Sequence, residues 1–168
     1  MVEALNRAAA WFNAAGLPVL ASRDWHPPQT GHFKGFGGIW PPHCVQGTSG
    51  ADFHPGLRLP PETVVVSKGS EPDTDSYSAF DGTTTDGASL GSILAGLQVR
   101  HLFVGGLATD YCVLSSVLDA RRAGLAVTVL LDAVAGVEVA AGDSERALAE
   151  MRSAGAQFCE VDSLTVPA

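Results

Sequence analysis

The stretch LFVGGLATDYCV, from Leu102 to Val113, decides how this sequence folds. Its apolar beginning predicts a buried strand, the glycine pair predicts a tight turn, and the amphipathic pattern behind Cys112 predicts a helix. A cysteine in the first turn of a helix lies near unpaired backbone N–H groups and the positive end of the helix dipole, which lower the pKa of a thiol. Free cysteines are mostly buried and inert. The helix-start context nevertheless favours Cys112 as a nucleophile.

Outward from this stretch, strands and helices alternate along the whole chain. This order predicts a three-layer α/β/α sandwich with a mostly parallel sheet, formed by residues 1–168 as one domain. The chain opens with a helix that has no strand before it, so the first strand of such a fold is missing. Strands are expected at 18–24, 63–66, 102–104, 127–131 and 157–161, and helices at 2–15, 88–97, 113–124 and 143–154.

The composition excludes several classes of protein. Of 168 residues, 46% are hydrophobic and 17% charged, which is typical of a compact globular domain. The net charge of −8, with scattered Lys and Arg, argues against a nucleic-acid partner. Three cysteines without a Cys-x-x-Cys motif do not form a disulfide framework, and no segment has the pattern of a membrane span or signal peptide. We therefore expect a cytoplasmic protein.

The segment 25–61 is a long loop rich in Gly, Pro and His. It follows the strand that ends near Asp24, and it contains His26, His32 and His43. Imidazoles together with a carboxylate suit zinc, iron or manganese. Loop histidines are also commonly just solvated, so the residues alone indicate a metal site only weakly.

Other polar and aromatic side chains are expected at the same edge of the sheet. Lys68 follows the strand 63–66, and the carboxyl ends of parallel strands are where such sheets bind ligands. A lysine there would hold a nearby thiol as thiolate, although a strand-end lysine can also simply extend into solvent. Trp40 and Tyr77 lie in loops on this side. They are candidates for the wall of an aromatic-ligand pocket, or for ordinary loop packing.

Four motifs together resemble the nicotinamidase/pyrazinamidase branch of the isochorismatase-like cysteine hydrolases. They are SRDWHPPQTGHF (22–33), WPPHCVQGTSGADFHP (40–55), VVSKG (65–69) and GGLATDYCV (105–113), and the resemblance covers essentially the whole chain. It implies that a divalent metal ion, zinc, iron or manganese, is bound by Asp24, His26, His32 and His43.

The resemblance also implies roles around the thiol. Cys112 would be the nucleophile and Lys68 its activator. A non-proline cis peptide between Leu107 and Ala108 would direct the backbone N–H groups of Ala108 and Cys112 into an oxyanion hole. The substrate pocket would be lined by Leu107, Trp40 and Tyr77.

One departure from the family pattern concerns the catalytic acid. Family members begin with a central strand that ends in an Asp, which completes a triad with the Lys and the Cys, and this chain begins after that point. Asp24 and Asp110 belong to other motifs, so neither is expected to replace it. Loss of an interior strand should expose apolar faces on its neighbours and leave the chain poorly stable.

The implied reaction is the hydrolysis of nicotinamide, a small-molecule substrate, to nicotinate and ammonia through a thioester on Cys112. Two alternatives remain open: another amide hydrolase of the superfamily, and a non-catalytic protein that binds nicotinamide or metal without the triad acid. The sequence also leaves open which metal binds, which nicotinamide analogues are preferred and whether the chain forms a homo-oligomer.

Overall fold

The computed structural model describes residues 1–165 of the chain. Helices and strands alternate as predicted, and most boundaries agree within three residues; β3 and β4 continue three and four residues beyond the predicted strands. The long elements follow the order α1 (Val2–Ala14), β1 (Leu20–Asp24), β2 (Val64–Lys68), α2 (Leu90–Gly96), β3 (His101–Leu107), α3 (Leu114–Arg122), β4 (Ala126–Ala135), α4 (Asp143–Ser153) and β5 (Gln157–Cys159).

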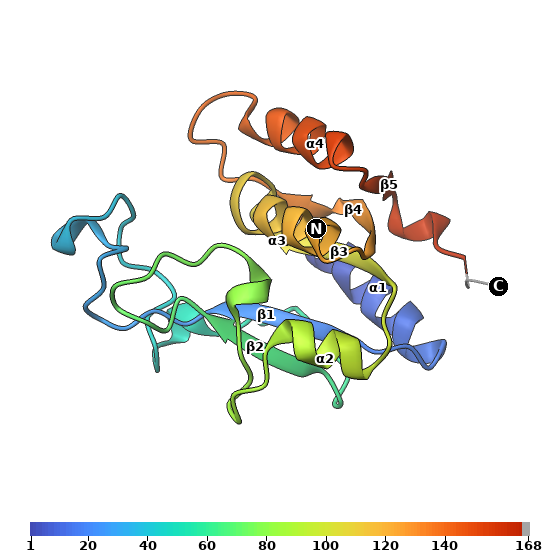
Figure 1. Cartoon of the computed structure of the whole chain (residues 1–168), viewed down its shortest axis with the longest axis horizontal. Coiled ribbons are helices and arrows are strands. Elements are labelled where there is room, and N and C mark those ends of the chain that lie inside the picture. Colours follow the sequence, from blue (N-terminus) through green and yellow to red (C-terminus); the bar gives the residue numbers. More distant parts are fainter. Residues whose placement is uncertain (166–168) are drawn as a thin grey trace.

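The strands form two parallel sheets (Figure 1). One sheet pairs β1 with β2, and the other has the order β3-β4-β5. The predicted α/β class with parallel strands is confirmed. The prediction of a single sheet is wrong, because within residues 1–165 no strand of the first sheet pairs with a strand of the second.

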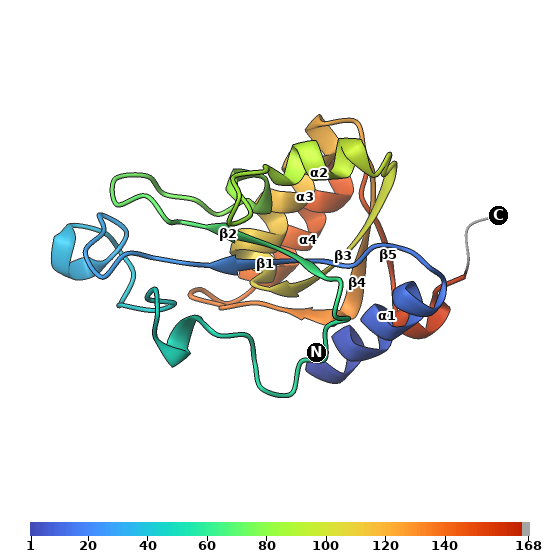
Figure 2. The same ribbon diagram turned by 90° about the horizontal axis from the view of Figure 1, so that it is seen from below.

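Strand β4 organises the hydrophobic core. Successive side chains of a strand point to opposite faces of the sheet, so the apolar residues of β4 contribute to the core on both faces. Val127 and Val129 pack against α3 and α4, whereas Leu130 packs against α1 on the other side. Figure 2 shows this layering, with α2, α3 and α4 above the strands and α1 below them. The expected three-layer arrangement is therefore present around β4.

Burial differs sharply between the strands. Four consecutive residues of β4, from 127 to 130, are buried, whereas no residue of β1 or β3 is. Leu107 at the end of β3 remains 60% exposed. The other apolar residues of β1 and β3 are half-buried, so the predicted exposure of apolar strand faces is present only at Leu107.

The long loops project beyond the carboxyl ends of β1 and β2. In Figures 1 and 2 the first part of segment 25–60 and the first part of segment 70–88 extend on the same side of the molecule, whereas the chain before β2 returns to α1, where Asn6 donates a hydrogen bond to the carbonyl of Gly56. Only short turns and isolated bridges interrupt the two segments, among them His26 with Val45 and Phe33 with Trp40. Within the described residues, no helix has the length and apolar character needed to cross a membrane.

Candidate active site

Cys112 lies on a π-helical turn between β3 and α3. The turn spans Thr109–Val113, and the N–H of Val113 donates to the carbonyl of Ala108, five residues earlier, at 3.0 Å. The peptide between Leu107 and Ala108 is cis, as the resemblance implied. Cys112 thus lies within the wide turn that leads into α3. The sequence predicted it in the first turn of the α-helix itself. Such π-turns are frequent at functional sites.

Lys68 brings the end of β2 to this turn. Its Nζ donates a hydrogen bond to the Sγ of Cys112 at 3.3 Å and another to the carbonyl of Ser76 at 3.2 Å. The lysine side chain is only 4% exposed. The predicted meeting of a cation with the thiol is therefore confirmed in the structure.

Asp24 completes a chain of contacts with these two residues. It ends β1 directly opposite Lys68 in the register of the first sheet, and its Oδ1 accepts a hydrogen bond from Lys68 Nζ. The structure thus places Asp24 in contact with Lys68, a contact that the motifs of the sequence do not predict. The parallel register explains this contact, because it places the last residues of both strands side by side.

The pKa values follow from burial and these contacts. Burial raises the pKa of the Cys112 thiol above its ordinary value of 9.0, although Lys68 acts in the opposite direction. The expected lowered pKa is therefore wrong. Burial alone would lower the pKa of Lys68, but Asp24 and Cys112 raise it overall. The lysine is thus held as a cation beside the sulfur.

Three histidines from the long loop converge near this group. His26, His32 and His43 each offer a ligand nitrogen, and these atoms lie within 4.8 Å of one another. The Nδ1 atoms of His26 and His43 face the carbonyls of Gly69 and Pro41 at 3.0 and 2.8 Å. Since a carbonyl only accepts hydrogen bonds, these Nδ1 atoms carry a proton, which leaves Nε2 as the nitrogen that could bind a metal.

Gly69 allows the ring of His26 to approach the end of β2. Its φ is +65°, and a Cβ at this position would overlap the imidazole of His26. His26 is buried, and burial lowers its pKa, which favours the neutral form that metals bind. The glycine of the VVSKG motif therefore shapes the histidine cluster.

Asp24 has a different position from the histidines. It is not part of their convergent group, although its charge acts on His26. Among the hydrogen bonds of residues 1–165, only its Oδ1 is engaged, by Lys68. Its second oxygen remains available to a cation.

Aromatic side chains cover the space beside the histidines. The indole N–H of Trp40 donates to the hydroxyl of Tyr77 at 2.9 Å, and the centroids of the Trp40 and His32 rings lie 6.2 Å apart. Tyr111 packs edge-on against Trp40 with ring centroids 4.8 Å apart. The structure thus brings both predicted aromatics together and adds a third.

Two residues of the site were not predicted from the sequence. The position of Tyr111 next to Cys112 could have indicated its role. Asp75 accepts a hydrogen bond from Nδ1 of His32 at 2.7 Å, and no local pattern in the polar loop 70–87 marks it.

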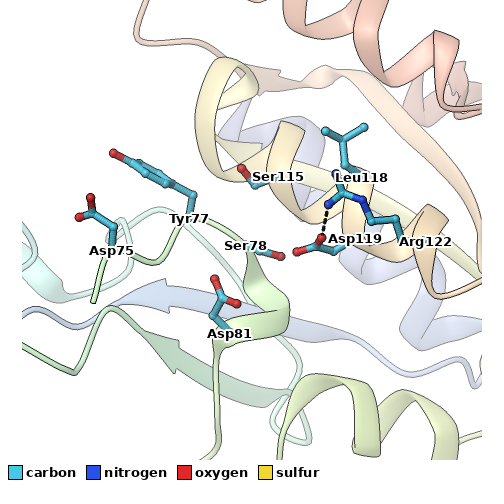
Figure 3. A pocket seen from close by; sticks show the side chains of 8 residues that line it. All are labelled: Asp75, Tyr77, Ser78, Asp81, Ser115, Leu118, Asp119 and Arg122. Carbon is cyan, nitrogen blue, oxygen red and sulfur yellow. Dashed lines mark hydrogen bonds and ion pairs between the residues drawn. The ribbon is translucent and has the colours of Figure 1, made fainter. Parts of the chain in front are cut away.

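A cavity of about 330 Å³ lies beside the site, between the loop that carries Tyr77 and helix α3. Figure 3 shows that the side chains of Asp75 and Tyr77 extend to one side of this cavity, away from Asp119 and Arg122 on α3. Asp119 and Arg122 form an ion pair with each other at 2.7 Å. The cavity therefore adjoins the site through Asp75 and Tyr77.

The sequence of the chain is similar to those of a known protein family. A sequence model described as the isochorismatase domain matches residues 1–163. A nicotinamidase of Escherichia coli is 40% identical over 92% of this chain and 80% of its own length. A nicotinamidase/pyrazinamidase of Mycobacterium tuberculosis is 42% identical over 83% of this chain and 75% of its own.

Solved structures show the same similarity. The crystal structure of the pyrazinamidase of Pyrococcus horikoshii in complex with zinc superposes with a TM-score of 0.86 at 41% identity. The match covers 95% of this chain and 84% of that one. Sequence and fold therefore agree over nearly the whole chain.

Proposed function

We propose that this chain, which belongs to the isochorismatase family, is an amidase that hydrolyses nicotinamide to nicotinate and ammonia. The observation that carries the proposal is the 3.3 Å hydrogen bond between Lys68 Nζ and Cys112 Sγ, next to three convergent histidines. The similar proteins of E. coli and M. tuberculosis are a nicotinamidase and a nicotinamidase/pyrazinamidase, which supports this substrate.

Cys112 supplies the nucleophile in the proposed reaction. Its thiol passes a proton by way of the Lys68 ammonium group to the Asp24 carboxylate, and the sulfur attacks the carboxamide carbon. The C–N bond then breaks, the nitrogen takes up the proton and leaves as ammonia, and a thioester remains on the sulfur. Water adds to the thioester, releases nicotinate and returns the thiol. The contacts among Asp24, Lys68 and Cys112 provide the path for the proton.

The turn around Cys112 supports the developing oxyanion. A backbone hydrogen bond from Ala108 lowers the pKa of the Cys112 thiol, so this amide is directed at the reacting sulfur. We assign the N–H groups of Ala108 and Cys112 as oxyanion donors, because fixed donors at this position stabilise a tetrahedral intermediate. Leu107, Trp40 and Tyr77 are assigned to the pocket wall around the pyridine ring.

The histidine cluster fits a divalent metal. Three imidazoles whose Nδ1 atoms are engaged in hydrogen bonds form a donor set typical of zinc, iron or manganese. We propose His26, His32 and His43 as ligands, with the second oxygen of Asp24 as a fourth. A bound metal would supply a Lewis acid that orients the substrate. The zinc in the P. horikoshii structure is consistent with such a site.

The test is the release of ammonia from nicotinamide by the zinc-loaded protein, compared with C112A. We expect loss of at least about a thousandfold of the activity, because nucleophile removal in comparable enzymes costs that much or more. C159A is the matched control, since Cys159 lies on β5 away from the site, and it should keep its activity. Equal ammonia release by wild type and C112A would reject the proposal.

A further inference from the structure

Three consecutive residues join the parts of the site. Asp75 accepts a hydrogen bond from His32, the carbonyl of Ser76 accepts one from Lys68, and the hydroxyl of Tyr77 accepts one from Trp40. We call residues 75–77 the strap. It contacts the histidine cluster, the activating lysine and the aromatic wall at once.

Asp75 differs from the other supports of the histidine cluster. The Nδ1 atoms of His26 and His43 face neutral backbone carbonyls, whereas Nδ1 of His32 faces a carboxylate. A carboxylate holds the imidazole in the Nδ1–H tautomer, fixes the ring and makes Nε2 a stronger donor to a metal. The Asp75 carboxylate also places a negative charge close to the proposed metal site, where a bound divalent cation would add positive charge.

The difference in exposure between His32 and Asp75 indicates that their hydrogen bond positions the histidine. The His32 side chain is 5% exposed, while that of Asp75 is 65% exposed. Asp75 therefore contributes little to core packing, and its visible partner is the histidine. In Figure 3 its carboxylate extends away from α3, at one side of the cavity that it helps to line.

We propose that Asp75 is a positioning residue of the metal centre, which acts through His32 and sets how tightly the site holds a divalent cation. This inference rests on the proposed histidine site and deepens it. Outer contacts of this kind change metal affinity about 10- to 100-fold when they are removed. The other two residues of the strap keep their own contacts, with Lys68 and Trp40, and should not depend on the Asp75 charge.

The experiment measures zinc affinity by competition with a chromogenic chelator, without substrate. We expect D75N to bind zinc about tenfold more weakly than wild type, and D75A up to about a hundredfold more weakly. D73N and D73A are the matched controls: Asp73 is an exposed residue of the same loop, and no hydrogen bond or ion pair joins it to another residue in the range 1–165. Their affinity should stay within about twofold of wild type.

A second readout separates positioning from a general collapse of the strap. The rate at which iodoacetamide modifies Cys112 in the metal-free protein, followed by peptide mass spectrometry, should be unchanged in D75N, because Lys68 remains on Ser76 and Cys112. Wild-type zinc affinity in D75A would overturn the inference. So would an equal loss in D73A, or a changed Cys112 alkylation rate in D75N. The affinity measurement is independent of ammonia release, so failure of either proposal is recognised separately.

Discussion

The two sheets of this molecule serve the site in different ways. The β3-β4-β5 sheet carries Cys112 on a turn supported by a packed core, in which Val117, Val129 and Met151 are fully buried. The β1-β2 sheet carries Asp24 and Lys68 at its strand ends and the histidines in the loop after β1, where hydrogen bonds and the one fully buried ring of Phe33 support them. The nucleophile therefore depends on an extended core, whereas the proposed metal centre depends on polar contacts and a single buried aromatic residue.

The largest loss of activity is expected when the contact between the two sheets is removed. K68Q removes the cation that links Asp24 of the first sheet to Cys112 of the second. Loss of acid–base help costs about 10²- to 10⁴-fold in rate, so we expect ammonia release to fall by that amount. K34Q, which changes the other lysine of the chain, is the control and should remain active.

The same variant changes the pH dependence of the thiol. In metal-free wild type, the alkylation rate of Cys112 should rise with pH to a midpoint above 9, since burial raises the pKa of this thiol. Lys68 acts to lower that pKa, so K68Q should move the midpoint higher and slow alkylation at pH 7 by about tenfold or more. A midpoint that moves to lower pH would contradict the assigned role of Lys68.

Stability should also differ between the two halves. M151A removes a fully buried side chain of α4 that packs against β4, and such changes cost about 2–5 kcal/mol. L20A truncates a half-buried residue of β1, and we expect about 1 kcal/mol or less. Denaturant unfolding followed by circular dichroism measures both. Equal losses would show that the half-exposed sheet is as tightly packed as the core.

The sequence was most informative where apolar periodicity is strong. The run from Val127 to Leu131 and the helix at 143–154 predict elements that the structure confirms, because burial on one or both sides leaves a pattern in the residues. The sequence also identified the residues that the structure brings together around Cys112: Lys68, Trp40, Tyr77 and the three histidines.

What the sequence did not predict depends on strand register and loop path. The contact between Asp24 and Lys68 follows from the parallel pairing of β1 with β2, which local patterns do not specify. The raised pKa of Cys112 follows from burial by surrounding segments, which outweighs the helix-start argument. Asp75 reaches His32 across 43 residues of chain, so only the folded loop reveals it.

The central claim is that the histidine cluster and the Cys112 turn form one substrate site. It is tested most directly by protection of Cys112 from iodoacetamide by saturating nicotinate, the proposed product, in zinc-loaded and in metal-free protein. We predict slower alkylation of Cys112 with nicotinate only when zinc is bound, since the metal would hold the ligand beside the sulfur. Equal protection in both forms, or none in either, would contradict the account.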